Sequence, residues 1–95
     1  MTNGADSFVR DEAVLWRRVV DGVLLLPPDS DELMLLTGSG GEIWHALERP
    51  RTMTALATVL AARYDVTEQH LLSQVLPSTL DELERRRAVR RVVPG

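Results

Sequence analysis

The sequence has no cysteine and no lysine, and only four of its 95 residues are aromatic. The absence of cysteine excludes disulfide bonds, thiolate metal ligands and thiol nucleophiles, and it fits a reducing compartment. The apolar runs are far shorter than the roughly 20 residues that cross a bilayer, and the N-terminus lacks the pattern of a signal peptide. We therefore expect a cytoplasmic protein without membrane contact, stabilised by aliphatic packing.

The length and composition indicate one small domain. Hydrophobic residues make up 44% of the chain and charged residues 26%, which is typical of a folded globular protein. Residues 1–13 are mainly polar, and we expect them to form a flexible N-terminal tail. The domain itself should then cover residues 14–91, and residues 92–95 should form a C-terminal tail.

The basic residues are all arginine, and five of the eleven gather near the C-terminus. These five are Arg85, Arg86, Arg87, Arg90 and Arg91. The formal net charge is nevertheless −3, and an acidic chain would repel phosphates, so we expect no nucleic-acid partner. The alternative is a DNA-binding winged helix that uses these arginines, and its affinity would fall steeply with salt.

The segment from Trp16 to Leu36 is typical of three antiparallel strands. Asp21-Gly22 lies between two apolar segments and predicts a hairpin with a type I′ turn. A proline-rich turn cluster at residues 27–31 cannot continue a strand, and residues 33–36 form the next apolar segment. The sequence therefore predicts a three-stranded antiparallel sheet ahead of the helices.

Helical periodicity begins at Ser39, where Ser39 and Glu42 fit a capping box. Thr52 or Thr54 is expected to cap a second helix, and the pair Asp65 and Glu68 predicts the start of a third. Pro77 should kink this third helix without ending it, because the apolar stripe keeps its phase across the proline. Three helices after a three-stranded sheet give an α+β fold, with Trp44 in the core.

The sequence carries no convincing catalytic, metal-binding or cofactor-binding pattern. The histidines are only His45 and His70, and neither belongs to a recognisable triad or ligand set. The residues Ser39-Gly40-Gly41 are better explained by helix capping than by phosphate binding, because no P-loop motif is present. We therefore expect a binding module rather than an enzyme, with no metal and no cofactor.

The third predicted strand, residues 33–36, contains no proline and no charge that would prevent pairing at its edge. Such an edge can accept an added strand from a partner. It could also pair with a second copy of the chain, so a homodimer stays open. A structural adaptor that holds a partner enzyme without touching a peptide is a further alternative.

Over roughly residues 14–90, the sequence resembles the PqqD-like proteins, also called RiPP recognition elements. Leu36 is followed eight residues later by Trp44, and Arg51-Thr52 lead into an L-x-x-x-L-x-x-x-Y-x-V pattern. The segments that carry the resemblance are residues 21–26, 33–44, 50–52 and 56–66.

This resemblance implies a winged helix-turn-helix fold that binds the leader segment of a ribosomally made precursor peptide. The leader would lie as an extra strand beside the third strand, against the third helix, and would be presented to a peptide-modifying enzyme. Of the strand residues, Met34 and Leu36 are expected to face the core. The implied peptide-binding residues are Leu33, Met34, Leu35 and Leu36 on the strand, and Leu76, Thr79, Leu80, Leu83 and Arg86 or Arg87 on the helix.

Overall fold

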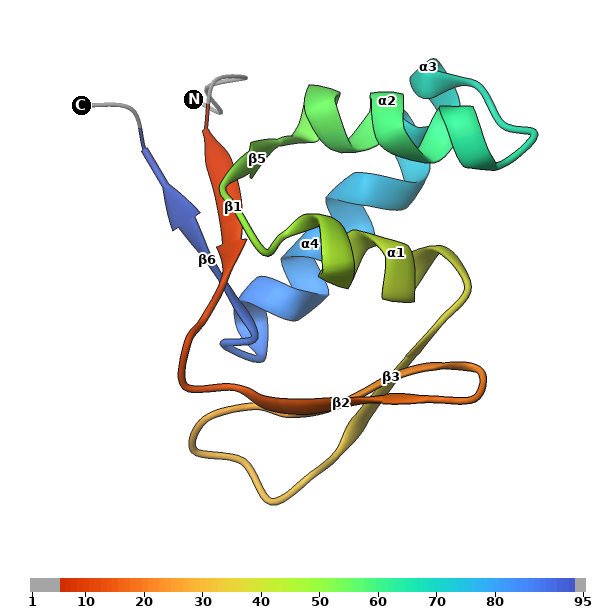
Figure 1. The fold of residues 1–95 in the computed structure, drawn as a ribbon. Helices are drawn as coiled ribbons and strands as arrows, with labels where there is room; N and C mark the ends of the chain where they lie inside the picture. Colours follow the sequence, from red (N-terminus) through yellow and green to blue (C-terminus); the bar gives the residue numbers. More distant parts are fainter. Residues whose placement is uncertain (1–5, 94–95) are drawn as a thin grey trace.

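The computed structural model describes residues 6–93, which form two three-stranded antiparallel sheets and three helical segments (Figure 1). This arrangement confirms the predicted α+β class with antiparallel strands. The first sheet has the order β2-β3-β4 and is built from Leu15–Val19, Gly22–Leu26 and Met34–Thr37. The second has the order β5-β1-β6 and is built from Arg51–Thr52, Ser7–Arg10 and Val89–Val92.

In the chain all helices follow β4, with β5 between the first two of them and β6 after the last, and in Figure 1 they lie over the β2–β3 hairpin. Helix α1 covers Ser39–Ala46 and α2 covers Met53–Arg63. The third helical segment is continuous from Glu68 to Arg85 and has three parts. They are α3 (Glu68–His70), the π-helical turn η1 (Leu71–Val75) and α4 (Leu76–Arg85).

The second sheet shows that the predicted N-terminal tail is wrong for residues 7–10. These residues form β1, in which Phe8 and Val9 are buried, and β1 pairs with both β5 and β6. Its partners lie far away in the sequence, as in the pair Ser7 and Val92, so no local pattern announces the strand. Val92 likewise ends β6 instead of opening a tail. Residues 1–5 and 94–95 of the two predicted tails lie outside the described residues.

The β2–β3 hairpin forms as predicted, but its turn lies one residue earlier. Val19 pairs with Gly22, so the two turn residues are Val20 and Asp21, and neither has a positive φ. The predicted type I′ turn at Asp21-Gly22 is therefore wrong. Gly22 is needed for a different reason, because a Cβ atom there would lie 1.9 Å from the carbonyl oxygen of Leu36. The glycine thus allows β4 to approach β3 closely.

Of the three predicted helix caps, only one is confirmed. The Thr52 side chain accepts a hydrogen bond from the Ala55 N–H at 3.1 Å and caps α2. Helix α1 instead begins after Gly38, whose φ of 56° turns the chain, and it has no side-chain cap. The third segment is capped by the Thr67 hydroxyl, which accepts from the His70 N–H. The predicted capping boxes at Ser39 and Asp65 are therefore wrong.

Pro77 lies in the first turn of α4 and follows the π-helical turn directly. Proline has no N–H to donate to the carbonyl four residues earlier, so a regular helix would leave the Ser73 carbonyl without its partner. In the π turn the Leu76 N–H donates instead to Leu71, five residues back. This shift lets the backbone stay helical through the proline, as the sequence predicts.

The core lies between the helices and the inner face of the first sheet. The largest fully buried side chain of the core is Trp44, as predicted. Separately, no helix within residues 6–93 is long and apolar enough to cross a membrane. Apart from Phe8 of β1, the other buried members are aliphatic side chains. They include Val23, Leu25, Ile43, Leu47, Leu56, Leu60, Leu76, Leu80 and Leu83.

Replacing Gly22 with alanine tests the close approach of β3 and β4. We expect Gly22→Ala to lower the free energy of unfolding by about 1–3 kcal/mol, since the added methyl group would overlap backbone atoms of β4. Gly40→Ala is the matched control, because the same methyl group in α1 meets only ordinary contacts and should be neutral or stabilise by up to about 1 kcal/mol. Equal effects of the two changes in urea unfolding would contradict the argument.

Candidate functional site

Strand β4 is an edge strand, and its side chains divide cleanly between two environments. Met34 and Leu36 are partly buried and pack against the core, as the alternation predicts. Leu33 and Leu35 point the other way and are 61% and 56% exposed. The partners in β3 follow the same alternation, since Val23 and Leu25 are buried. Half of the predicted strand site is therefore structural, and the exposed half lies on the outer face of the sheet.

The backbone groups of β4 divide in the same regular way. Val19 and Gly22 close a two-residue hairpin, so they form a hydrogen-bonded pair, and alternate residues of β3 then direct their N–H and C=O groups toward β4. Val23 pairs with Leu36 in this way, which fits the position of the Leu36 oxygen against β3. It follows that Leu35 and Thr37 direct their N–H and C=O groups to the free edge. Among residues 6–93 no backbone group pairs with that edge.

The other edge of the same sheet is β2, and its sequence is less suited to accepting a strand. Arg17 and Arg18 lie in the middle of β2 and are exposed, whereas β4 carries no charged residue. Charged side chains on an edge strand discourage pairing with another chain. Of the two edges of this sheet, β4 is therefore the one open to an added strand.

The third helical segment runs beside β4 in the opposite direction. At its beginning, Leu71 and Val75 line a small pocket together with Ser39, which follows β4 in the chain. At its end, Arg86 lies 4.0 Å from Glu32, and Arg87 donates to Asp29 at 3.1 Å, both in the loop that precedes β4. The two ends of this helical segment thus lie near the residues that follow and precede β4 in the chain.

A row of half-buried side chains follows the helix on the border of the core. Its members are Leu72, Val75, Thr79, Glu82 and Arg86. Their spacing of three or four residues places them on one face of the helix. We call this row the border face, because its side chains lie between the buried core stripe and the exposed side of the helix.

The helix residues predicted to bind the peptide differ in their burial. Leu76, Leu80 and Leu83 are only 0–1% exposed and belong to the core, so they offer little surface to a guest chain. Thr79 and Arg86 belong to the border face, as expected for groove residues. Arg87 is well exposed and is bound to Asp29 in the loop before β4. Arg87 has a positive φ of 60° and follows the C-cap residue of α4, Arg86.

Sequence reasoning missed Leu72, Val75 and Glu82 of the border face. The signal for them was present, because Val75, Thr79 and Glu82 each stand one position before a core leucine. A core stripe along a helix has two flanks, however, and the sequence alone does not say which flank faces the sheet edge. The flank is decided by how the helix packs across the first sheet.

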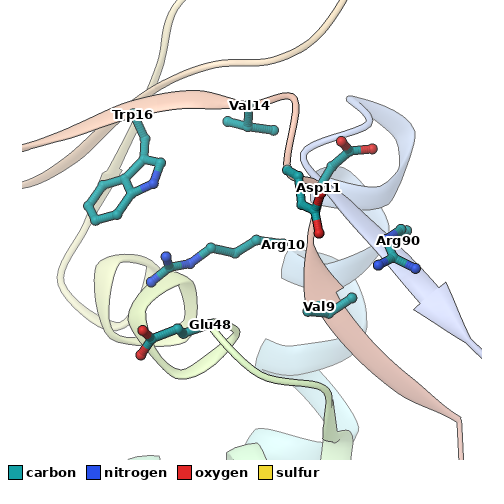
Figure 2. Close-up of a pocket in the computed structure, with 8 residues that line it drawn as sticks. Val9, Arg10, Asp11, Val14, Trp16, Glu48 and Arg90 are labelled. Atoms are coloured by element: carbon teal, nitrogen blue, oxygen red, sulfur yellow. The ribbon is translucent and has the colours of Figure 1, made fainter.

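A second concave feature surrounds Arg10, which reaches from β1 toward Trp16 (Figure 2). The cavity has a volume of about 310 Å³. The Arg10 guanidinium lies 4.7 Å from the Trp16 ring centre and 5.1 Å from that of Trp44. Its Nε donates to the Trp44 carbonyl oxygen at 2.8 Å, so this side chain joins the second sheet to α1 and β2. Burial lowers the pKa of Arg10, while the charge of Glu48 opposes that effect.

The polar lining of this cavity consists of carboxylates and arginines, namely Asp11, Glu12 and Glu48 with Arg10 and Arg90. Its lining includes no serine, threonine, cysteine or histidine that could serve as a nucleophile or as a base for one. In the described part of the chain, no three His, Cys, Asp or Glu side chains lie together as a metal site would require. The Arg10 cavity therefore serves to connect the two sheets, and the free edge of β4 is the better candidate site.

The chain is thus a small α+β domain with an edge strand, β4, whose outward N–H and C=O groups are unpaired within residues 6–93. The chain belongs to the PqqD family, since the family model described as coenzyme PQQ synthesis protein D matches residues 22–89. That match begins with β3 and includes β4 and all three helical segments. No curated protein matches the chain.

One solved structure is similar over almost the whole chain. It is the solution NMR structure of the PqqD truncation of Methylobacterium extorquens PqqCD, described as a functional and stand-alone RiPP recognition element. The TM-score is 0.75 at 20% sequence identity, with 96% of each chain covered. At this identity the likeness concerns the fold, and it supports the strand and helix arrangement described above.

Neighbouring residues of α4 test the division between core and border face. Leu80→Ala should lower the free energy of unfolding by about 2–5 kcal/mol, because it leaves a cavity in the core. Thr79→Ala should change it by less than about 0.5 kcal/mol, because this side chain lies at the border of the core. Chemical unfolding followed by circular dichroism measures both, and similar losses would contradict the assignment.

His45 offers a pH test of the packing around β2. Its pKa lies below the ordinary value because burial disfavours the imidazolium and because Arg18 and Arg10 repel it. The stability of the fold should therefore fall as the pH drops through the ordinary range of histidine. Arg18→Gln should raise the pKa of His45 in an NMR titration. Arg17→Gln is the control and should leave it unchanged, because Arg17 faces the opposite side of the strand.

Proposed function

We propose that this chain is a non-catalytic winged helix-turn-helix module that binds the leader segment of a ribosomally made precursor peptide. The leader would add a strand to the free edge of β4 and would then be presented to a peptide-modifying enzyme. The observation that carries this proposal is that the backbone of Leu35 and Thr37 has no partner among residues 6–93 at the edge of the sheet. Membership of the PqqD family and the fold of a RiPP recognition element support it.

The energetics of strand addition are consistent with useful affinity only if side chains contribute. About four hydrogen bonds to Leu35 and Thr37, at roughly 0.5–1.5 kcal/mol each, give about 2–6 kcal/mol. Micromolar binding needs about 8 kcal/mol. The difference must come from leader side chains that bury apolar surface, at roughly 1.5–3 kcal/mol for each large residue. The backbone would therefore set the register, and about one to four buried side chains would set the affinity.

The inward side chains of an added strand would face the same side as Met34 and Leu36. There they would meet the border face, which is apolar at Leu72 and Val75 and charged at Arg86. Arg86 is 4.0 Å from Glu32, at the limit of an ion pair, so it could contact an acidic residue of the leader. The outward side chains would extend the exposed row of Leu33 and Leu35, where a modifying enzyme could meet both chains.

Leu35→Pro is the direct test of the edge. Proline removes an N–H that points away from β3, so the fold should survive while leader binding is lost or weakened at least tenfold. Isothermal titration calorimetry with the leader of a precursor peptide encoded near this gene measures the effect. Leu35→Ala is the matched control, because it keeps the N–H and should retain most of the affinity.

Unchanged affinity of a folded Leu35→Pro variant would refute the placement of the leader. A salt series adds a second criterion, since strand addition should depend only weakly on ionic strength. Binding of duplex DNA with an affinity that falls steeply with salt would favour the DNA-binding alternative instead.

A further inference from the structure

A small apolar pocket lies just beyond the C-terminal end of β4. It has a volume of about 200 Å³ and lies between the beginning of α1 and the beginning of the third helical segment. Its lining residues are Ser39, Tyr64, Val66, His70, Leu71 and Val75. Tyr64 and Val66 are 37% and 38% exposed, so these two large side chains are left partly uncovered at its opening.

The π-helical turn gives this pocket two of its walls. Leu71 and Val75, the first and last residues of η1, both line it. The turn lies just before Pro77, which cannot donate a hydrogen bond to the preceding turn. One extra residue in a helical turn widens the helix locally, and such turns occur often at functional sites.

The size of the pocket limits what it could hold. Sites for free small molecules usually measure about 300–1,000 Å³, whereas a 150 Å³ cavity accepts one benzene ring. A pocket of about 200 Å³ therefore fits a single large side chain better than an independent ligand. Its aliphatic walls and the Tyr64 ring favour an apolar group.

The position of the pocket links it to the free edge. Ser39 stands two residues after Thr37, and Val75 belongs both to the pocket and to the border face. The space beside Gly38 is open, since a Cβ atom there would meet nothing within 4 Å. Side chains alternate along a strand, so the inward position that follows the one beside Leu36 falls beside Gly38, at this end of the edge.

We propose that this pocket is the anchor site for the docked leader and takes one bulky apolar side chain, namely leucine, isoleucine, methionine or phenylalanine. This inference rests on the proposed strand addition, which brings the side chain to the pocket. It assigns the specificity for that residue to Tyr64, Val66 and Val75. A leader without a bulky apolar residue at this place would bind with the correct register but weakly.

The test uses peptides selected from a phage-displayed library of random linear dodecapeptides. Fluorescence anisotropy of the best selected peptide measures its affinity for the whole protein and for three variants. Val66→Asp should weaken binding roughly ten- to a hundredfold, because a charge would replace an apolar wall. Asp65→Asn, next in the chain but outside the lining, should change it less than twofold. Leu35→Pro reports separately on strand addition.

A change on the peptide side keeps the test valid if Val66→Asp does not fold. Replacing the enriched bulky residue of the peptide with alanine should cost the same ten- to a hundredfold. The two changes together should cost little more than either alone, because they remove one contact.

The outcomes separate this inference from the proposed function. If Leu35→Pro abolishes binding but the Val66 and peptide changes each cost less than twofold, the anchor site is overturned and strand addition stands. If Leu35→Pro leaves binding intact, strand addition fails and the anchor inference fails with it. Self-association of the protein that Val66→Asp abolishes would place a second copy in the pocket and would also overturn the inference.

Discussion

The unmatched hydrogen-bonding groups of β4 are the constraint on which the rest of this structure depends. A backbone N–H or C=O that is buried without a partner costs free energy, so an unpaired edge must stay in contact with water or with a guest chain. The helix cannot satisfy it, because helical backbone groups are already bonded to one another. The protein therefore keeps β4 short and covers only one of its faces, through Met34 and Leu36.

Several distant features hold this edge in place. Gly22 lets β3 approach β4 to a distance that any larger residue would prevent. Arg86 and Arg87 lie close to the acidic loop before β4, while Gly38 turns the chain into α1 directly after it. Exposed ion pairs of this kind contribute little to the stability of the fold.

The sequence predicts the parts of this fold that are local. The β2–β3–β4 meander, the Thr52 cap and the burial of Trp44 follow from alternation, capping chemistry and helical periodicity. The second sheet does not follow, because Ser7 pairs with Val92 and no short window contains both strands. The division of β4 into inward and outward residues could be predicted for the same reason as the meander. The helix residues of the candidate site could not be predicted, because the core stripe has two flanks and only the packing of the helix on the sheet decides which flank faces β4.

The π-helical turn contributes two residues to the pocket that we propose as the anchor site. Pro77 in the interior of a regular helix would cost about 3 kcal/mol, and here it lies just after a π-helical turn in which the Leu76 N–H donates to Leu71. The wider turn then places Leu71 and Val75 around a pocket at one end of the free edge. Backbone pairing gives every guest strand nearly the same bonds, so it cannot distinguish one leader from another. Under the proposed function, discrimination would come from a side-chain pocket whose position is fixed relative to the edge, and the pocket between α1 and the third helical segment is our candidate.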